Sequence, residues 1–304
     1  MSMRILVFGM NGQLGWQCVK DLPGAIGVDR ACLDAATPSI KDDLNQLLDR
    51  YQPDVVINAI AYTAVDRAEQ ERELAFRINA DFPSQLAKLV AKALLIHISS
   101  DYVFDGHSSQ AYQESDPPAP LSVYGASKRA GELAILESGA NALVLRSTWL
   151  IGEQGQNFAK SILRLACTRS ELRVVEDQRG VPTPTPFLVA QIASALRLND
   201  KGPRGLFHLV PAGQTDWYRY AKHILEKAQL HRRWQSILRV RASALEAITT
   251  DQYPLAAARP RNSCLDTGRW KQVFGLEQLP HYQQVLDPVL DRILEKEPVP
   301  SQVP

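Results

Sequence analysis

The feature that most constrains the fold is a glycine-rich turn directly after an apolar run at the start of the chain. Residues 4–8 are mainly apolar, and the chain continues Gly9-Met10-Asn11-Gly12-Gln13-Leu14-Gly15. Glycines at this spacing let the backbone turn sharply and approach a pyrophosphate, while the helix that follows offers free N–H groups. Between a strand and a helix, the turn predicts a dinucleotide site, whereas a lone glycine triplet would be weak evidence.

Apolar runs alternate with helical patterns through the first half of the chain. Strands are expected at 4–8, 25–28, 55–58, 94–99 and 142–146, with helices between them, for instance at 40–51 and 82–92. Runs that are apolar throughout are typical of strands covered on both faces. The β-α-β order predicts a Rossmann-type α/β fold with a doubly wound parallel sheet.

The second half has a looser rhythm, which predicts a smaller C-terminal α/β domain on the substrate side. Helices are expected at 158–168, 187–198 and 217–229, and short strands at 172–175 and 206–210. We therefore divide the chain into a dinucleotide-binding domain, 1–148, and a mainly substrate-binding domain, 149–294, some of whose segments return to the Rossmann core. Residues 295–304 are charged and proline-rich and are expected to form a disordered tail.

Composition argues against several classes of partner. Lysine plus arginine number 34 and aspartate plus glutamate 33, so no broad basic surface is expected for nucleic acid. No apolar run approaches the roughly 20 residues that span a bilayer, and none resembles a secretory signal. The cysteines form no C-x-x-C pair, which is typical of reduced thiols in the cytoplasm; they are Cys18, Cys32, Cys167 and Cys264.

The most specific chemical motif is Tyr124-Gly125-Ala126-Ser127-Lys128, followed by a helical pattern. A spacing of four places phenol and ammonium on one helix face. A nearby lysine cation is expected to bring the pKa of a tyrosine down toward a useful range, so that Tyr124 could protonate a carbonyl oxygen while a cofactor delivers hydride. An exposed helix pair would explain the spacing alone, but the glycine turn and alternating strands favour catalysis.

Two strand ends add further candidates. Ser100, after the fourth strand, is the expected hydrogen-bond donor to the carbonyl, with Ser99 as the alternative, because carboxyl ends of strands face the ligand crevice. Asp29 ends the second strand, where a carboxylate can bind the adenosine ribose, which favours NADH. Arg30 could accept a 2′-phosphate, so the cofactor is expected to be NADH or NADPH. Ordinary strand-end polar residues are the alternative reading.

Together these motifs resemble the extended short-chain dehydrogenase/reductase family. The chain is most similar to the branch that reduces 4-keto nucleotide sugars, the dTDP-4-dehydrorhamnose reductases. Matching phrases run almost end to end, including Asp54-Val55-Val56-Ile57-Asn58-Ala59, Ser100-Asp101-Tyr102-Val103-Phe104, Arg146-Ser147-Thr148-Trp149, Asp177-Gln178-Arg179-Gly180-Val181-Pro182-Thr183 and Arg259-Pro260-Arg261-Asn262-Ser263. The resemblance implies NAD(P)H-dependent reduction of dTDP-4-dehydro-L-rhamnose to dTDP-L-rhamnose.

The resemblance also implies roles for individual residues. The catalytic triad falls on Ser100, Tyr124 and Lys128, with serine where many members have threonine. The cofactor is expected to contact Gly9, Asn11, Gly12, Gln13, Leu14, Gly15, Asp29, Arg30, Ala59, Ala61, Tyr124 and Lys128. The nucleotide sugar is expected to contact Asp101, Tyr102, Trp149, Asn157 and Arg261. Dehydratases of the family carry a glutamate at the position of Tyr102, so reduction is favoured over dehydration.

Other readings stay open at this point. Some family members hold magnesium at a dimer contact through a glutamate, and the matching residue here is Gln17, a weaker ligand for a hard dication. No metal ligand is therefore assigned, magnesium is doubtful, and a homodimer is only a candidate assembly. The chain could reduce a different 4-keto nucleotide sugar, or be a non-catalytic regulatory subunit of the same fold, although an intact triad argues against the latter.

Overall fold

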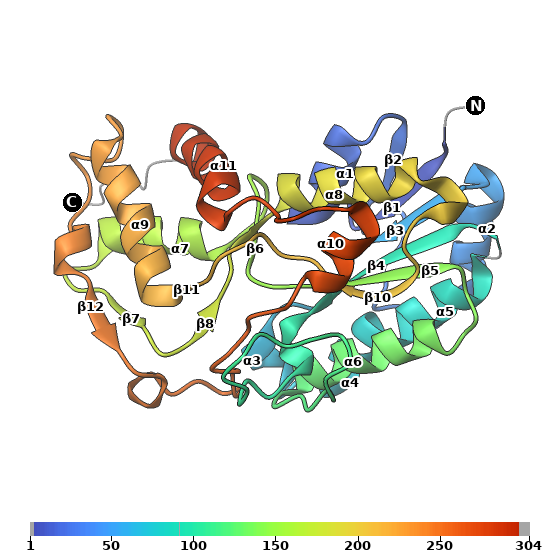
Figure 1. Cartoon of the computed structure of the whole chain (residues 1–304), viewed down its shortest axis with the longest axis horizontal. Helices are drawn as coiled ribbons and strands as arrows, with labels where there is room; N and C mark the ends of the chain where they lie inside the picture. The colour runs from blue at the N-terminus through green and yellow to red at the C-terminus, as the bar shows by residue number, and fades with distance from the viewer. Residues whose placement is uncertain (1–2, 91, 298–304) are drawn as a thin grey trace.

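The computed structural model describes residues 3–90 and 92–297, which form two lobes side by side (Figure 1). The larger lobe is built on a six-stranded sheet whose neighbouring strands are all parallel. In spatial order the strands are β2 (Ala25–Val28), β1 (Ile5–Phe8), β3 (Val55–Asn58), β4 (Leu94–Ser100), β5 (Ala142–Ser147) and β10 (Gly205–His208). The strand order reverses between β1 and β3, the point at whose carboxyl end open α/β sheets usually bind ligands.

Helices cover both faces of this sheet, as the apolar strands require (Figure 1). One face packs against α1 (Gln13–Asp21), α8 (Thr185–Arg197) and α10 (Gly268–Phe274). The other packs against α2 (Lys41–Tyr51), α5 (Phe82–Leu89) and α6 (Val123–Leu136). Three short segments lead into α5, namely α3 (Val65–Ala68), α4 (Arg72–Phe76) and the π-helical turn η1 (Arg77–Asp81). The predicted doubly wound sheet is confirmed.

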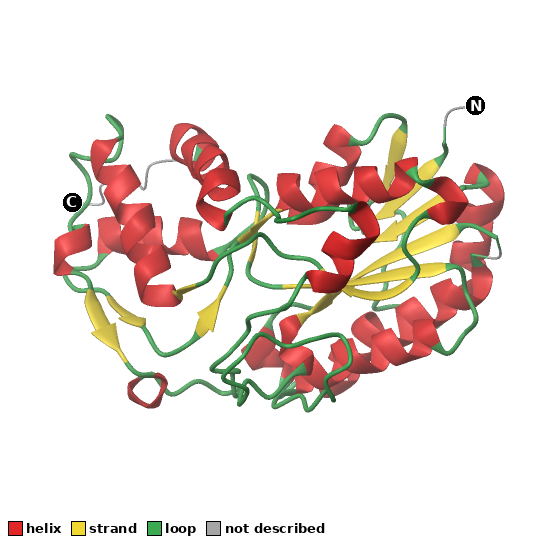
Figure 2. Cartoon of the chain, in the orientation of Figure 1, coloured by secondary structure: helices red, strands yellow, loops and turns green. Residues whose placement is uncertain are grey.

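The smaller lobe has its own apolar core, formed mainly by three helices: α7 (Phe158–Thr168), α9 (Trp217–Leu230) and α11 (Tyr282–Lys296). Around them lie short strands: β6 (Leu150–Ile151), β7 (Arg173–Val175), β8 (Arg179–Gly180), β9 (Thr183–Pro184), β11 (Thr215–Asp216) and β12 (Glu246–Ile248). Much of the chain between the two lobes is loop (Figure 2). None of the described helices is long and apolar enough to cross a membrane.

Some boundaries differ from those expected. The helix expected over 82–92 ends at Leu89, where the chain turns into β4, and the strand expected at 206–210 ends at His208. α11 continues to Lys296, so the first two residues of the expected disordered tail are helical, because the apolar stripe of α11 extends to Leu294 in the core. Glu297 caps the end of this helix, and the remainder of the expected segment, 298–304, lies outside the described residues.

The second half also contributes to the sheet lobe. α8, β10 and α10 pack on the larger sheet, and Trp270 of α10 is fully buried there. This packing brings residues after position 180 against the strands of the first half.

Candidate active site

The glycine turn after β1 is packed so closely that each glycine has a steric reason. Gly9 has φ +86°, a left-handed conformation that other residues rarely adopt. A Cβ on Gly15 would lie 2.1 Å from the carbonyl oxygen of Gly9, and one on Gly12 would lie 3.3 Å from it. The first turn of α1 therefore approaches the β1 turn more closely than side chains allow, and the amino end of a helix in this position is suited to bind a pyrophosphate.

Gln13 ties this turn to the loop after β6. Its Oε1 accepts hydrogen bonds from the backbone N of Gly152, at 2.8 Å, and from Nδ2 of Asn157, at 3.3 Å. Asn157 also caps α7 by accepting from the N of Lys160, and it donates to Gly152 O. All polar atoms of the Asn157 side chain are thus engaged between the lobes, so the structure places it beside the glycine turn.

The second strand ends on Asp29 and Arg30 as expected. Asp29 Oδ1 accepts from the N of Cys32 at 2.9 Å, and this hydrogen bond lowers the pKa of the carboxyl. Arg30 is exposed and pairs with Asp34 at 3.1 Å. Because such exposed pairs contribute only about 0–1 kcal/mol, Arg30 can leave Asp34 for another anion at little cost.

The helix that carries the Y-x-x-x-K motif begins in a well-capped turn. Ser122 Oγ accepts from the N of Gly125, and Glu69 Oε1 accepts from the N of Val123 at 2.8 Å. A Cβ on Gly125 would lie 2.1 Å from the carbonyl oxygen of Tyr102, so glycine here lets α6 pack against the turn after β4. The ring of Tyr124 meets the edge of Tyr102, with centroids 5.4 Å apart.

Lys128 is buried one turn along α6 from Tyr124. Its Nζ donates to the carbonyl oxygen of Ile98 at 2.6 Å and lies 3.5 Å from Nε2 of His97. Burial lowers the pKa of Lys128 to about 8, against an opposing effect of Glu132. The sequence therefore brings the predicted pair to the carboxyl end of β4, beside Ser100.

The pKa of Tyr124 differs from the sequence-based expectation. Burial raises it to about 12, although the Ser100 hydroxyl acts in the opposite direction. Desolvation dominates because the phenolate would be buried in low-dielectric surroundings. Tyr124 therefore stays a protonated phenol at neutral pH, the form that can donate a proton.

Unpartnered polar atoms mark the same edge of the sheet. Within the described chain, the buried oxygens Ser99 Oγ and Ser147 Oγ have no hydrogen-bond partner, and both lie at the carboxyl ends of β4 and β5. Ser100 Oγ donates to Asp101 Oδ1 at 3.0 Å and accepts from the N of Tyr102. Orphan buried groups call for a partner, so this edge is suited to a polar ligand.

A cavity of about 630 Å³ lies in the smaller lobe beside Tyr102. Its walls include Phe158, Trp217, Gln178, Arg173 and Arg259. Such a volume is in the usual range for small-molecule sites, and its mixed aromatic and cationic lining suits a ligand with both a ring and phosphates.

Trp149 reaches this cavity through Trp217. The two indoles are stacked, with centroids 3.7 Å apart and planes at 19°. The backbone of Trp149 has φ +42°, an uncommon conformation for a bulky residue. A Cβ on Gly180 would lie 2.6 Å from the Trp149 ring, so glycine in β8 makes room for the stack. Strain of this kind is concentrated at ligand sites.

Arg261 lies farther from the triad. Its side chain is 57% exposed and its Nη2 lies 3.3 Å from Asp251, a residue of the cavity wall. The predicted catalytic and sugar-binding residues thus fall into three groups: the triad with Asp101 and Tyr102, Asn157 at the glycine turn, and Trp149 with Arg261 on the cavity side.

The motif analysis missed several residues that shape the site. Trp217 and Phe158 are cavity walls, and Asn79 in the π turn η1 donates to Ser127 Oγ at 2.9 Å on the catalytic helix. His97 contacts Lys128. The aromatic start of α9, Trp217-Tyr218, was the available signal for the cavity, while Asn79 and His97 carry no spacing that announces their contacts.

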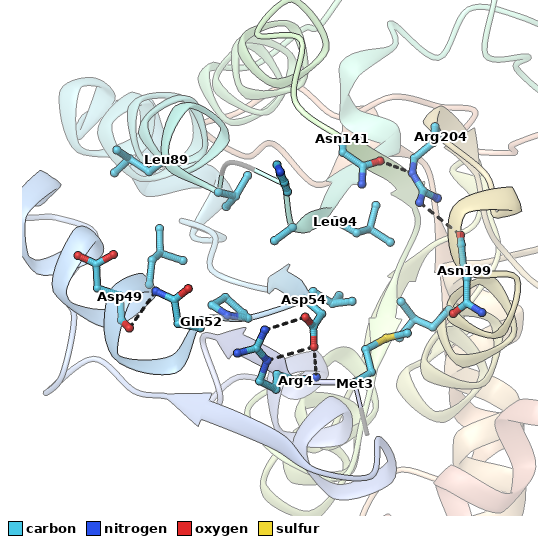
Figure 3. Close-up of a pocket in the computed structure, with 17 residues that line it drawn as sticks. Met3, Arg4, Asp49, Gln52, Asp54, Leu89, Leu94, Asn141, Asn199 and Arg204 are labelled. Carbon is cyan, nitrogen blue, oxygen red and sulfur yellow. Dashed lines mark hydrogen bonds and ion pairs between the residues drawn. The ribbon is translucent and has the colours of Figure 1, made fainter. Parts of the chain in front are cut away.

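A second cavity, of about 610 Å³, lies at the opposite edge of the sheet (Figure 3). It is lined by residues at the amino ends of β1, β3, β4 and β5. Arg4 there is paired with Asp54 at 2.9 Å, and Arg204 hydrogen-bonds Asn141. The cavity lies at the amino ends of the strands, away from the carboxyl ends where the triad lies, and two of its cationic groups, Arg4 and Arg204, already have partners.

Gln17 occupies the position where magnesium was judged doubtful. It is buried, its Nε2 donates to Asp21 at 2.6 Å, and its Oε1 lies 3.4 Å from Thr185 Oγ1. Both ends of the amide are therefore used within the protein. Across the described ranges no group of three or more His, Cys, Asp or Glu side chains is arranged to hold a metal ion.

Comparisons with known proteins agree with this geometry. The model of the RmlD substrate binding domain family matches residues 3–295. The dTDP-4-dehydrorhamnose reductase of Escherichia coli K12 is 40% identical over 292 residues, which are 92% of this chain and 95% of that protein. The spore coat polysaccharide biosynthesis protein SpsK of Bacillus subtilis is 35% identical over 86% of this chain and 88% of its own.

Solved structures show the same fold. The dTDP-4-dehydrorhamnose reductase of Bacillus anthracis, crystallised in complex with NADP, superposes with a TM-score of 0.85 at 32% identity, covering 96% of this chain and 99% of that one. The Clostridium acetobutylicum orthologue gives a TM-score of 0.83 at 33% identity, covering 95% and 99%.

Proposed function

The chain belongs to the RmlD substrate binding domain family, and we propose that it reduces the 4-keto group of dTDP-4-dehydro-L-rhamnose to give dTDP-L-rhamnose. The observation that carries this proposal is the convergence of Ser100, Tyr124 and Lys128 at the carboxyl edge of the sheet, beside a cavity with aromatic and cationic walls. The enzyme is an NAD(P)H-dependent oxidoreductase of dTDP-rhamnose biosynthesis.

The glycine turn fits a dinucleotide cofactor, because a Cβ on Gly15 would fill the space against Gly9. The residues that would hold the cofactor are Gly9, Asn11, Gly12, Gln13, Leu14, Gly15, Asp29, Arg30, Ala59 and Ala61, with Tyr124 and Lys128 at the reacting end. When bound, the nicotinamide supplies the hydride that reduces the ketone. NADH and NADPH both suit the site, since Asp29 favours ribose hydroxyls and Arg30 can turn toward a phosphate.

The chain's own residues complete the reduction. Tyr124 donates its phenolic proton to the sugar oxygen, which its raised pKa makes possible because the phenol is protonated at neutral pH. Ser100 lies beside it and can turn its hydroxyl toward the carbonyl oxygen, since a hydroxyl both donates and accepts. Lys128, held by the carbonyl of Ile98, provides the positive charge beside the phenolate that forms.

Recognition is assigned to the second lobe and the turn after β4. Asp101 and Tyr102 face the sugar, Trp149 supports the cavity wall through Trp217, and the guanidinium of Arg173 suits the diphosphate, whereas that of Arg259 is already held by Asp66. Arg261 extends this cationic side, and Asn157 acts from the Gln13 contact between the lobes. We assign the sheet lobe, with residues 1–148, to the cofactor and most of 149–294 to the sugar nucleotide. We place the enzyme in the cytoplasm, and a homodimer stays a prediction.

The direct test is an absorbance assay at 340 nm with NADH or NADPH and dTDP-4-dehydro-L-rhamnose, made in place by the upstream enzymes. Oxidation of cofactor with dTDP-L-rhamnose as product supports the proposal. Faster oxidation with a UDP- or GDP-linked 4-keto sugar would assign a different substrate. Cofactor binding without oxidation of any of these would contradict the catalytic assignment and favour a regulatory subunit.

A further inference from the structure

A chain of three buried polar side chains ends on Lys128. Asn58, at the end of β3, His97, in β4, and Lys128, in α6, are each at most 1% exposed. Asn58 Nδ2 lies 3.0 Å from His97 Nδ1, and His97 Nε2 lies 3.5 Å from Lys128 Nζ. This row of hydrogen-bonded side chains runs across the sheet from β3 to β4 and then to the catalytic helix. The directions of its hydrogen bonds therefore affect the protonation of Lys128.

The direction of the chain is fixed at its far end. The backbone N of Ile60 donates to Asn58 Oδ1 at 3.0 Å, so the amide oxygen faces Ile60 and the amide nitrogen faces the histidine. An amide nitrogen only donates, and therefore His97 Nδ1 must accept and carries no proton. An imidazole with one bare nitrogen is neutral, and its single proton is on Nε2.

The proton on Nε2 points toward the amino group of Lys128. A neutral amine has a lone pair that can accept this hydrogen bond, whereas an ammonium group has only donors. Nζ meanwhile donates to the carbonyl oxygen of Ile98 at 2.6 Å, which suits either form. The hydrogen bond from His97 therefore favours the neutral amine of Lys128 over the ammonium group.

We propose that Asn58 and His97 are positioning residues for Lys128, which hold its amino group against Ile98 and make its proton easier to release. This role rests on the proposed reductase function and deepens it. After Tyr124 has given its proton to the sugar oxygen, a lysine that releases a proton readily can help restore the phenol. The proton lost by the lysine ammonium is then regained from solvent, so that each turnover ends with both groups as they began.

Electrostatic surroundings agree with this assignment. Burial lowers the pKa of Lys128 to about 8 and holds the pKa of His97 well below its usual range, so the ring is neutral. On its own helix Lys128 is influenced by Glu132, which raises its pKa and is itself paired with Arg146 of β5 at 2.7 Å. The Asp101 carboxyl, in the turn after β4, acts on the pKa of Tyr124 and is engaged by Ser100, and the neutral Asn79 of η1 bonds Ser127 beside Lys128.

Asn58→Asp tests this hydrogen-bond network, because it reverses the direction of the hydrogen bonds with almost no change in the shape of the side chain. The new carboxylate accepts hydrogen bonds both from Ile60 N and from the His97 ring, so His97 Nδ1 gains a proton. Nε2 then either loses its proton and accepts from Lys128, or keeps its proton in a positively charged ring. We measure the titration of the Lys128 ε-carbon signal by NMR in the ¹³C-lysine-labelled full chain, assigned by its loss in Lys128→Met. If the His97 ring stays neutral, its Nε2 accepts from Lys128, and the new carboxylate also favours the charged lysine. The pKa of Lys128 is then expected to rise by roughly 1 unit or more.

Two further variants distinguish the effect of the hydrogen-bond network on Lys128 from simple effects of charge or packing. His97→Gln can accept from Asn58 and present an N–H to the lysine, so it should leave the Lys128 titration close to wild type. Asn79→Asp places the same charge against α6 from another element and should move the titration much less than Asn58→Asp does. If Asn58→Asp does not fold, Asn58→Leu, which frees the ring to turn an acceptor toward the lysine, should still raise the pKa.

An unchanged titration in both Asn58 variants, or an equal rise in Asn79→Asp, would overturn the proposal. The alkaline limb of the pH profile of kcat/KM should move upward with the titration, a shift that a purely structural defect would not produce. Because the titration needs no substrate, a wild-type chain without reductase activity would refute the proposed function and leave this result standing.

Discussion

The two lobes differ in what they bury. The core of the sheet lobe encloses charged and titratable side chains, among them Glu132, Arg146, His97 and Lys128, each at most 1% exposed. The core of the smaller lobe is mainly apolar and aromatic, with Trp149, Trp217, Phe158 and Tyr220 in mutual contact, and its buried carboxylate Glu153 pairs with Arg292 and Lys296 of α11. The sheet lobe also has very close backbone approaches, because a Cβ on Gly15, Gly125 or Gly131 would lie 2.1 Å from a backbone carbonyl oxygen.

This difference separates two tasks. Buried charges need fixed partners, because an unpaired one costs several kcal/mol, and a closely packed parallel sheet supplies them. Aromatic walls bind flat rings without requiring one exact orientation, so they tolerate small movements of the bound ring. Substitutions in the sheet lobe should therefore change stability and proton chemistry, while those in the smaller lobe should change substrate binding.

The largest effect is expected from Glu132→Ala. Its carboxylate accepts two hydrogen bonds from Arg146, both 2.7 Å, and the side chains are 0% and 1% exposed. Removing it leaves a buried guanidinium without its partner, which should lower the free energy of unfolding by about 3–5 kcal/mol in a urea titration. Asp54→Ala, which breaks the exposed pair with Arg4, is the matched control and should cost at most about 1 kcal/mol. Equal losses would remove the contrast between buried and exposed pairs.

A pH-dependent effect of intermediate size is expected at Asp101. Burial raises the pKa of its carboxyl to about 6, above the ordinary value of 3.8. The folded state therefore prefers the protonated acid, and wild-type stability should fall as the pH rises from about 4 to 6, by up to about 3 kcal/mol. Asp101→Asn removes this loss, so unfolding titrations should show the variant gaining on wild type across that interval. A constant difference between pH 4 and 7 would argue that the carboxyl is ionised throughout.

A smaller effect is expected from Trp217→Ala in the cavity wall. The substitution removes the partner of the Trp149 stack and part of the surface that the nucleotide would meet. KM for the sugar nucleotide should rise by roughly 10- to 100-fold, the 1–3 kcal/mol typical of a lost stacking surface, while kcat changes little. Trp270→Phe, in the core of the sheet lobe, is a control that should leave KM unaltered. A fall of kcat with unchanged KM would assign Trp217 to the chemistry instead.

The sequence predicted the sheet lobe better than the smaller one, for physical reasons. Tyr124 and Lys128 are four residues apart, and the glycine turn is a local structure, so spacing alone describes them. The stack of Trp149 on Trp217 and the contact of Asn58 with His97 join residues far apart in the chain, and no local period encodes such pairs. The pKa of Tyr124 was also misjudged, because burial depends on the whole packed site.

The helix ends show the same limit. α11 runs to Lys296 because Ile293 and Leu294 are buried in the smaller lobe, whereas the charged composition alone predicted disorder from residue 295. Family resemblance was the source of the predictions that spacing could not make, among them the assignments of Asp101 and Trp149 to the sugar. It did not foresee that Asn157 would be engaged with Gln13.

The most direct test of the account is steady-state kinetics of Tyr124→Phe, with Tyr102→Phe as the matched control, since the two rings are in contact but only the first is assigned the proton. The account predicts that Tyr124→Phe lowers kcat by roughly 10²- to 10⁴-fold with cofactor affinity retained, while Tyr102→Phe mainly raises KM. A Tyr124→Phe enzyme that turns over within a few-fold of wild type would contradict the assignment of Tyr124 as the proton donor.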